Sequence, residues 1–264
     1  MNIDAHSSPQ RAPENAATAK LVAHIRDARE VSESDAVEMF RLYEQYYDAT
    51  SFSLFRRDLT EKTHVIELRS DYILRGFSTA QLIHFELDGT SNHALFSGDT
   101  IVDAAYWGEQ ALVDAFCQLA GQVKSREPES PLYWFLISKG YRTYRYLSLF
   151  AQSYYPHPTQ PMPVSIQRRL RHLARHKFGD AYCAETGLIR FPQSRGHLCP
   201  QWAQVAGHLR EHPVVRFFLE RNPRYDAGDE LACLTELSVE NLRSFAKRAF
   251  IAGLRAPVKD HRGA

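Results

Sequence analysis

The stretch from Asp99 to Phe116 joins a strand pattern to a helix pattern through a turn that contains a glycine. An apolar run at residues 100–102 gives way to polar and aromatic residues up to Gly108, after which apolar residues recur at helical spacing. The first N–H groups of such a helix have no partner within it and can bind an anion beyond the strand end. The stretch therefore indicates an anion site near Gly108. The alternative is a turn that needs a glycine and binds nothing.

A carboxylate stands inside this otherwise apolar strand, where Asp99 lies between Gly98 and Thr100. A charge in such a place needs a partner or a role, so Asp99 is a candidate base or a group that orients an amine. The alternative is a β-bulge at residues 97–98 that leaves Asp99 in solvent or paired with an arginine. His84 and Glu86, on the neighbouring predicted strand, are weaker candidates for a base.

Two sets of residues have types that could bind a metal ion. His172 and His176 are spaced i, i+4 on a predicted basic helix, but no third ligand is evident and neighbouring arginines favour a solvated face. Cys183, His197 and Cys199 lack a fourth ligand at a suitable spacing. The sequence therefore predicts no metal site.

The run at residues 168–177 carries five fixed positive charges on one short helix and could bind a polyanion or be a solvated face. The chain as a whole has 32 basic and 31 acidic residues, so no overall field favours nucleic acid or membrane. The four cysteines form no closely spaced pair, and the N-terminus has no long apolar run. We therefore expect a reduced, cytoplasmic protein without a membrane segment.

The elements that must position these residues predict an α+β fold with a mixed, mostly antiparallel sheet flanked by helices. A short helix at 21–29 and a firmer one at 32–49 precede three strands at 64–69, 72–87 and 93–103, a helix at 108–124, a strand at 132–138 and a helix up to Pro156. A strand–helix–strand step after an antiparallel meander implies one parallel pair. We expect tails at 1–18 and 255–264, a core at 19–156, and a helix-rich elaboration at 157–254 that completes the sheet.

This element order and the opening stretch resemble the GNAT superfamily of acyl-CoA-dependent N-acyltransferases. One branch of that family has the pattern V-x-P-x-Y-W-G-x-G-x-x-x-E-A where its fourth strand meets its third helix, and here Val102 begins the match and Ala115 ends it. Residues 76–79, Gly-Phe-Ser-Thr, stand where the family's third strand carries a similar element. Ala104 replaces the usual proline, and Gln110 replaces the second glycine.

The resemblance implies an acyl thioester as co-substrate, either acyl-CoA or the acyl-phosphopantetheine of a carrier protein. It implies that backbone N–H groups from Gly108 to Leu112 bind the phosphates. The cofactor-binding residues that it implies are Ile101, Val102, Trp107, Gly108, Gln110, Ala111 and Leu112. The implied acceptor is an amine of a small molecule or peptide, and a carrier protein could bind the basic helix at 168–177. RNA is a less favoured partner.

Transfer from a thioester to an amine requires a base and an acid. The resemblance implies a tyrosine of the fourth helix as the acid, in a pattern like N-x-x-A-x-x-L-Y. With Lys139 at the asparagine position, Tyr146 stands at that tyrosine and Tyr144 is the second candidate, although the asparagine and alanine are absent. Asp99 would then be the base. The alternative is a GNAT-like module without catalysis that binds a protein, an acyl carrier or RNA.

Overall fold

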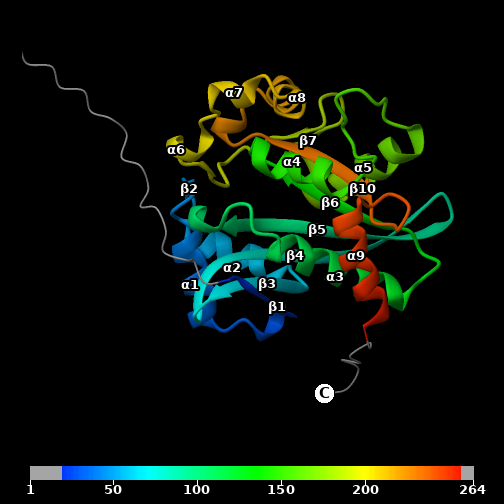
Figure 1. Ribbon diagram of the computed structural model, residues 1–264. Helices are drawn as coiled ribbons and strands as arrows, with labels where there is room; N and C mark the ends of the chain where they lie inside the picture. The colour runs from blue at the N-terminus through cyan, green and yellow to red at the C-terminus, as the bar shows by residue number, and fades with distance from the viewer. Residues whose placement is uncertain (1–19, 257–264) are drawn as a thin grey trace, which may run out of the picture.

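The computed structural model describes residues 20–256, and within them one sheet of eight strands forms the centre of the molecule (Figure 1). Across the sheet the strands are β1 (Val22–Asp27), β3 (His64–Ser70), β4 (Ile73–Leu87), β5 (Thr90–Val102), β6 (Leu132–Ser138), β10 (Glu230–Glu236), β8 (Leu188–Ile189) and β7 (Tyr182–Cys183). A second, two-stranded sheet pairs β2 (Tyr47–Asp48) with β9 (His197–Leu198). The predicted tail at 1–18 lies outside the described residues, as does most of the one at 255–264.

The longer helices cover both faces of this sheet. They are α1 (Glu33–Tyr43), α2 (Phe52–Thr60), α3 (Ala111–Arg126), α4 (Tyr141–Phe150), α5 (Val164–Phe178), α8 (Pro213–Arg221) and α9 (Ser244–Arg255), with short α6 (Pro200–Ala203) and α7 (Gly207–Arg210). Single 3₁₀ turns stand at Ala28–Glu30, Ala104–Tyr106, Gly179–Ala181 and Tyr225–Ala227. No helix in residues 20–256 is long and apolar enough to cross a membrane.

The parallel pair predicted from the element order is present. β5 pairs with β6 in parallel from His93 to Ser97, and α3 connects the two strands, while the other pairings of the sheet are antiparallel. β5 continues beyond Ser97 to Val102 without pairing to β6. The two strands therefore part at this point, and side chains and backbone of β5 are available there on the β6 side.

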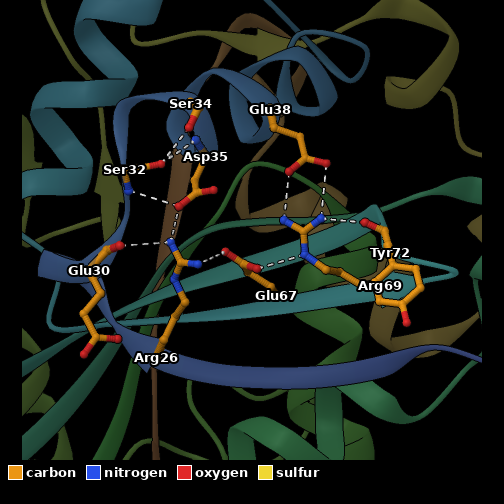
Figure 2. Close-up of polar contacts among 9 residues, drawn as sticks. All are labelled: Arg26, Glu30, Ser32, Ser34, Asp35, Glu38, Glu67, Arg69 and Tyr72. Atoms are coloured by element: carbon orange, nitrogen blue, oxygen red, sulfur yellow. Dashed lines mark hydrogen bonds and ion pairs between the residues drawn. The ribbon is translucent and has the colours of Figure 1, made fainter.

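The predicted helix at 21–29 is wrong, because residues 22–27 form the edge strand β1 against β3. One arginine of β1 and one of β3 link these two strands to α1, as Figure 2 shows. Arg26 and Arg69 flank the carboxylate of Glu67 at 3.3 and 3.1 Å, and the Glu67 side chain is only 4% exposed. Arg26 also pairs with Asp35 and Arg69 with Glu38, both on α1. These long-range ion pairs favour the strand over a local helix.

The two faces of the sheet have separate cores. α3, α4 and α9 pack with Leu95 and Leu136 on one face, and α3 and α9 lie side by side there (Figure 1). On the other face α1 and α2 pack around Phe77, and α5 packs on Phe96 and Phe135. The C-terminal part belongs to the same sheet as the predicted core, because β10 lies between β6 and β8.

Candidate functional site

Two cavities open beside the unpaired end of β5. The first, here the carboxylate cavity, has a volume of about 210 Å³ and lies among α1, α2, β5 and the C-terminal end of α5. Its polar lining includes Asp58, Glu61, Asp99, Lys139, Lys177, Arg195 and Glu230. The second, here the aromatic cleft, has a volume of about 470 Å³ and lies between β5 and α4. Its lining includes Tyr46, Val102, Trp107, Gly108, Arg142, Arg145, Tyr146 and Trp202.

The two cavities meet. Tyr47, Thr100 and Thr143 line both of them, and Thr100 lies in β5 three residues beyond Ser97, the last residue paired with β6. Gly108 lines the aromatic cleft and Asp99 lines the carboxylate cavity. The space that opens where β5 and β6 separate thus connects the cleft at Gly108 with the cavity at Asp99.

A bulge in β5 positions Asp99. Ser78 pairs with Thr100 and Ala80 with Ser97, so Thr79 of β4 faces two residues of β5, Gly98 and Asp99. The sequence left open a bulge at residues 97–98 with Asp99 in solvent or paired with an arginine, whereas the bulge lies at residues 98–99 and Asp99 lines the cavity. The Asp99 carboxylate is half-buried in the cavity and makes no ion pair within residues 20–256.

The surroundings of Asp99 make it a stronger base than an ordinary aspartate. Burial raises the pKa of Asp99 from 3.8 to about 6, the Asp58 carboxylate adds to this rise, and Lys62 and Lys139 partly oppose it. A carboxyl group with a pKa near 6 is ionised at neutral pH and still accepts a proton readily.

The other charges around the carboxylate cavity are largely paired with one another. Lys62 contacts Asp58 at 2.5 Å, Lys139 contacts Glu230 at 3.4 Å, and Lys177 contacts Glu61 at 3.3 Å. Tyr43 and Tyr47 stack at 4.6 Å between ring centres, and burial raises the pKa of both hydroxyls, so both keep their protons near neutral pH. Asp99 is therefore the carboxylate of this cavity that is free to bind a ligand cation.

The turn before α3 has an open, uncapped geometry. Gly108 has φ +101°, a backbone conformation that favours glycine, and no atom lies within 4 Å of where a Cβ would stand. Gln110 precedes the helix without a side-chain cap, so the first N–H groups of α3 are not satisfied by a capping side chain. Two arginines from α4 line the same cleft, and Arg142 lies 4.6 Å above the ring of Trp107. An uncapped helix start beside two guanidinium groups suits phosphate.

The glycine turn also carries a carboxylate that does not favour phosphate. Glu109 accepts a hydrogen bond from the N–H of Leu21 at 3.3 Å. This contact ties the carboxylate to the segment that leads into β1. Glu109 lies between Gly108 and Gln110. Of these, Gln110 is the residue that replaces the second glycine of the family pattern.

The predicted cofactor-binding residues separate into two groups. Ile101, Val102, Trp107 and Gly108 line the aromatic cleft. Gln110, Ala111 and Leu112 are not among its lining residues, and the Leu112 side chain packs in the core.

The two predicted tyrosines lie in different surroundings. Tyr146 lines the aromatic cleft, and burial raises the pKa of its hydroxyl. Tyr144 lines neither cavity, because its side chain is fully buried and its hydroxyl donates to the Pro156 carbonyl at 2.7 Å. We therefore keep Tyr146 alone as the candidate acid.

Several cavity residues were not predicted from the sequence. Tyr47 matched an ordinary apolar helix face, and Thr143 carries no signal of its own. Lys139 did carry a sequence signal, because it is a cation that stands directly after an apolar strand and before a helix. Trp202 reaches the cleft from the C-terminal part, where it stacks on Tyr46 at 4.9 Å.

The weaker candidates lie elsewhere. His84 and Glu86 are exposed at the far end of β4 and line neither cavity. Cys183 lies in β7, whereas His197 and Cys199 lie at β9 in the other sheet. The four cysteines are free.

Comparisons with known proteins find similarity in structure only. No family model matches the sequence, and no curated protein matches it. A probable N-acyltransferase from Enterococcus faecalis has a TM-score of 0.37 and 16% identity over 50% of this chain and 33% of its own. This chain thus matches about a third of that protein's length.

Two further solved structures match over more of their own length. A GNAT family N-acetyltransferase from Escherichia coli, in complex with CoA, has a TM-score of 0.34 and 16% identity over 52% of this chain and 72% of its own. An aminoglycoside acetyltransferase from an uncultured soil metagenomic sample, in complex with sisomicin, has a TM-score of 0.36 and 11% identity over 55% and 92%. Scores and identities this low assign neither a donor nor an acceptor to this chain.

The topology itself agrees with the family expected from the sequence. An antiparallel meander runs into one parallel pair, the pair parts beyond Ser97, and a glycine turn at Gly108 starts the crossover helix. These are the features that the resemblance in the sequence led us to expect of a GNAT-like sheet.

Proposed function

We propose that the protein is an N-acyltransferase that moves an acyl group from a thioester of coenzyme A to an amine of a small molecule or peptide. The observation that supports this most is the junction of the two cavities at Tyr47, Thr100 and Thr143. A two-substrate transfer needs the donor and the acceptor to meet while each keeps its own binding space.

The aromatic cleft is the proposed donor site. The uncapped N-terminus of α3 at Gly108 and the guanidinium groups of Arg142 and Arg145 would bind the phosphates. The edge of β5 at Ile101 and Val102, which does not pair with β6, would bind the pantetheine arm, with the Val102 carbonyl already accepting a hydrogen bond from the Trp107 indole at 2.8 Å. This direction of the arm brings a thioester to Thr100, at the junction.

The carboxylate cavity is the proposed acceptor site. An ammonium group is attracted to the unpaired carboxylate of Asp99, which then takes a proton from it. The amine nitrogen forms a bond to the thioester carbon and the carbon–sulfur bond breaks. Tyr146, whose raised pKa keeps its hydroxyl protonated, gives a proton to the departing sulfur and regains one from the acylated nitrogen, which leaves a neutral amide. A backbone N–H of β5 would polarise the carbonyl.

A carrier protein is the second proposed source of the thioester. Arg168, Arg171 and Arg175 lie with His172 and His176 along one side of α5, where they line a shallow basic surface. The C-terminal residues of the same helix, Lys177 and Phe178, line the carboxylate cavity. This surface suits the acidic helix of a carrier. A cytoplasmic location, where both donors occur, is part of the same proposal.

One observation favours a binding module without catalysis. Gln110 places a long side chain where the family pattern has its second glycine, and Glu109 places a carboxylate beside it. In that case the fold would recognise a partner without transferring an acyl group.

Thermal shift and native mass spectrometry with coenzyme A, acetyl-CoA and a long-chain acyl-CoA would test the donor site. We expect a stabilisation by at least one of them that Gly108→Asp abolishes, because this change adds bulk and a negative charge at the cradle. Glu86→Asp, at an exposed position of β4, is the matched control and should leave the thermal shift unchanged. No shift with any thioester, including a loaded carrier protein, would refute the donor site.

Release of thiol from the bound acyl-CoA, measured against a panel of amines, separates the two functions. We expect turnover with the parent protein and a large loss in Asp99→Asn. Binding of acyl-CoA without turnover on any amine would support the binding module instead.

A further inference from the structure

Two histidines and a glutamate come together at the end of the sheet far from both cavities. His84 of β4 stands directly opposite His93 of β5 in the antiparallel pairing, and their ring centres lie 4.4 Å apart. Glu127 follows the last turn of α3, and its carboxylate lies 3.2 Å from Nε2 of His93. One ligand atom from each of the three residues lies within 4.8 Å of the other two.

We propose that His84, His93 and Glu127 form a binding site for a divalent transition metal, with Zn²⁺ as the best match. Two imidazole nitrogens and one carboxylate oxygen are a donor set that Zn²⁺ takes, leaving a fourth position for water. Two ligands that bind one tetrahedral zinc ion at about 2.1 Å stand about 3.4 Å apart. The 3.2 Å between His93 and Glu127 is close to that spacing.

The site combines a fixed ligand with two accessible ones. The His93 side chain is only 4% exposed, and its backbone N–H donates to the Pro131 carbonyl at 2.9 Å. His84 is exposed and Glu127 is half exposed, so an ion can enter from solvent and both side chains can adjust to it. A rigid ligand with two adaptable neighbours favours binding without rearrangement of the sheet.

A hydrogen bond between His93 and Glu127 is the competing explanation for their contact, and it needs no ion. It does not involve His84, whose ring lies edge-on to that of His93. Binding of a metal therefore predicts a role for His84 that the hydrogen bond alone does not. The positive charge of Lys124, at the same end of α3, opposes the binding of a cation. Its ammonium group donates a hydrogen bond to the Ser130 carbonyl at 2.8 Å.

The position of the site indicates a structural role. His93 begins the parallel pairing of β5 with β6, and Glu127 opens the loop that leads from α3 into β6. An ion held there would join the β4–β5 hairpin to the crossover connection and fix the start of the parallel pair. It would stabilise the fold at the end opposite to Asp99 without taking part in transfer.

Isothermal titration of the chelator-treated protein with ZnCl₂ tests the proposal, with thermal unfolding as a second measurement. We expect one ion per chain and a rise in the unfolding temperature. His84→Ala and Glu127→Gln should each weaken binding at least tenfold, and both positions are accessible enough for the variants to fold. The matched control is the double variant His172→Ala and His176→Ala, on the other histidine pair of the structure, and it should bind like the parent.

Absence of zinc binding, or binding that His84→Ala leaves unchanged, would overturn the site. So would loss of binding in the α5 double variant alone, because the ion would then lie on that helix.

Discussion

Replacement of Asp99 by asparagine should make the protein more stable at neutral pH. The rise of the Asp99 pKa from 3.8 to about 6 means that the folded protein favours the protonated carboxyl group. The destabilisation is thus absent well below pH 3.8, grows as Asp99 ionises, and is complete above about pH 6. The difference between the two pKa values corresponds to about 3 kcal/mol at most, and to about 1–2 kcal/mol with allowance for solvent at a half-buried group. Asparagine has nearly the same shape and no charge, so it removes this cost.

Urea unfolding at pH 4.0 and pH 7.5 measures this effect without knowledge of a substrate. The free energy of unfolding of Asp99→Asn should exceed that of the parent at pH 7.5, and the gap should shrink at pH 4.0. Asp58→Asn is the matched control, and its free energy of unfolding should be lower than that of the parent. The reason is that the fully buried Lys62 loses the carboxylate that lies 2.5 Å away. If Asp99→Asn is as stable as the parent, or less stable, at pH 7.5, Asp99 is not an unpaired, desolvated carboxylate and its role as base loses its physical basis.

Three further outcomes are expected. If acyl transfer is detected, kcat/KM should fall on the acid side with an apparent pKa near 6, and activity at pH 5 should be about tenfold below the plateau; a flat profile from pH 5 to 8 would contradict this. Tyr146→Phe should lower kcat at least tenfold and leave the affinity for the thioester nearly unchanged, since only a hydroxyl is lost; equal turnover would remove Tyr146 as the acid. Gly121→Ala should lower the melting temperature by several degrees or prevent folding, because its Cβ would stand 2.1 Å from the Phe250 carbonyl oxygen of α9; an unchanged melting temperature would show that α3 and α9 can move apart.

The sheet was largely predictable because its strands carry local patterns. The strands predicted at 64–69, 72–87, 93–103 and 132–138 agree with β3, β4, β5 and β6 to within a few residues. The edge strand β1 was missed, since what holds it is pairing to β3 and the ion pairs of Arg26, and neither is a local property. The predicted helix at 108–124 begins at Ala111 instead, because a 3₁₀ turn and the left-handed Gly108 come first.

The site was predictable only where one residue contradicted its neighbours. Asp99 was noticeable as a charge in an apolar strand. Glu230 lines the same cavity from a strand more than 130 positions later, and Tyr47 borders both cavities from the short strand β2. Their types and spacing are ordinary, so their roles depend on tertiary contacts that no single segment encodes.

The direction in which Asp99 points depends on the bulge, and strict alternation along β5 would have placed it wrongly. Leu95 faces the α3 side of the sheet and Phe96 the α5 side, so an unbroken strand would turn every odd position, Asp99 included, toward α3. Ile101 nevertheless packs with α1 and α2, on the face that Phe96 shares. The extra residue opposite Thr79 has reversed the alternation between these positions.

Gly98 makes this reversal possible. A Cβ at Gly98 would stand 2.5 Å from Oγ1 of Thr79 and 2.6 Å from Cε of the buried Lys62, so a side chain there would displace one of these two side chains. With glycine at the bulge, Asp99 joins Tyr43 and Asp58 in the carboxylate cavity, and the next residue, Thr100, borders both cavities. One inserted residue in β5 therefore places the proposed base on the α1–α2 face and still leaves the strand edge beyond it open to the aromatic cleft.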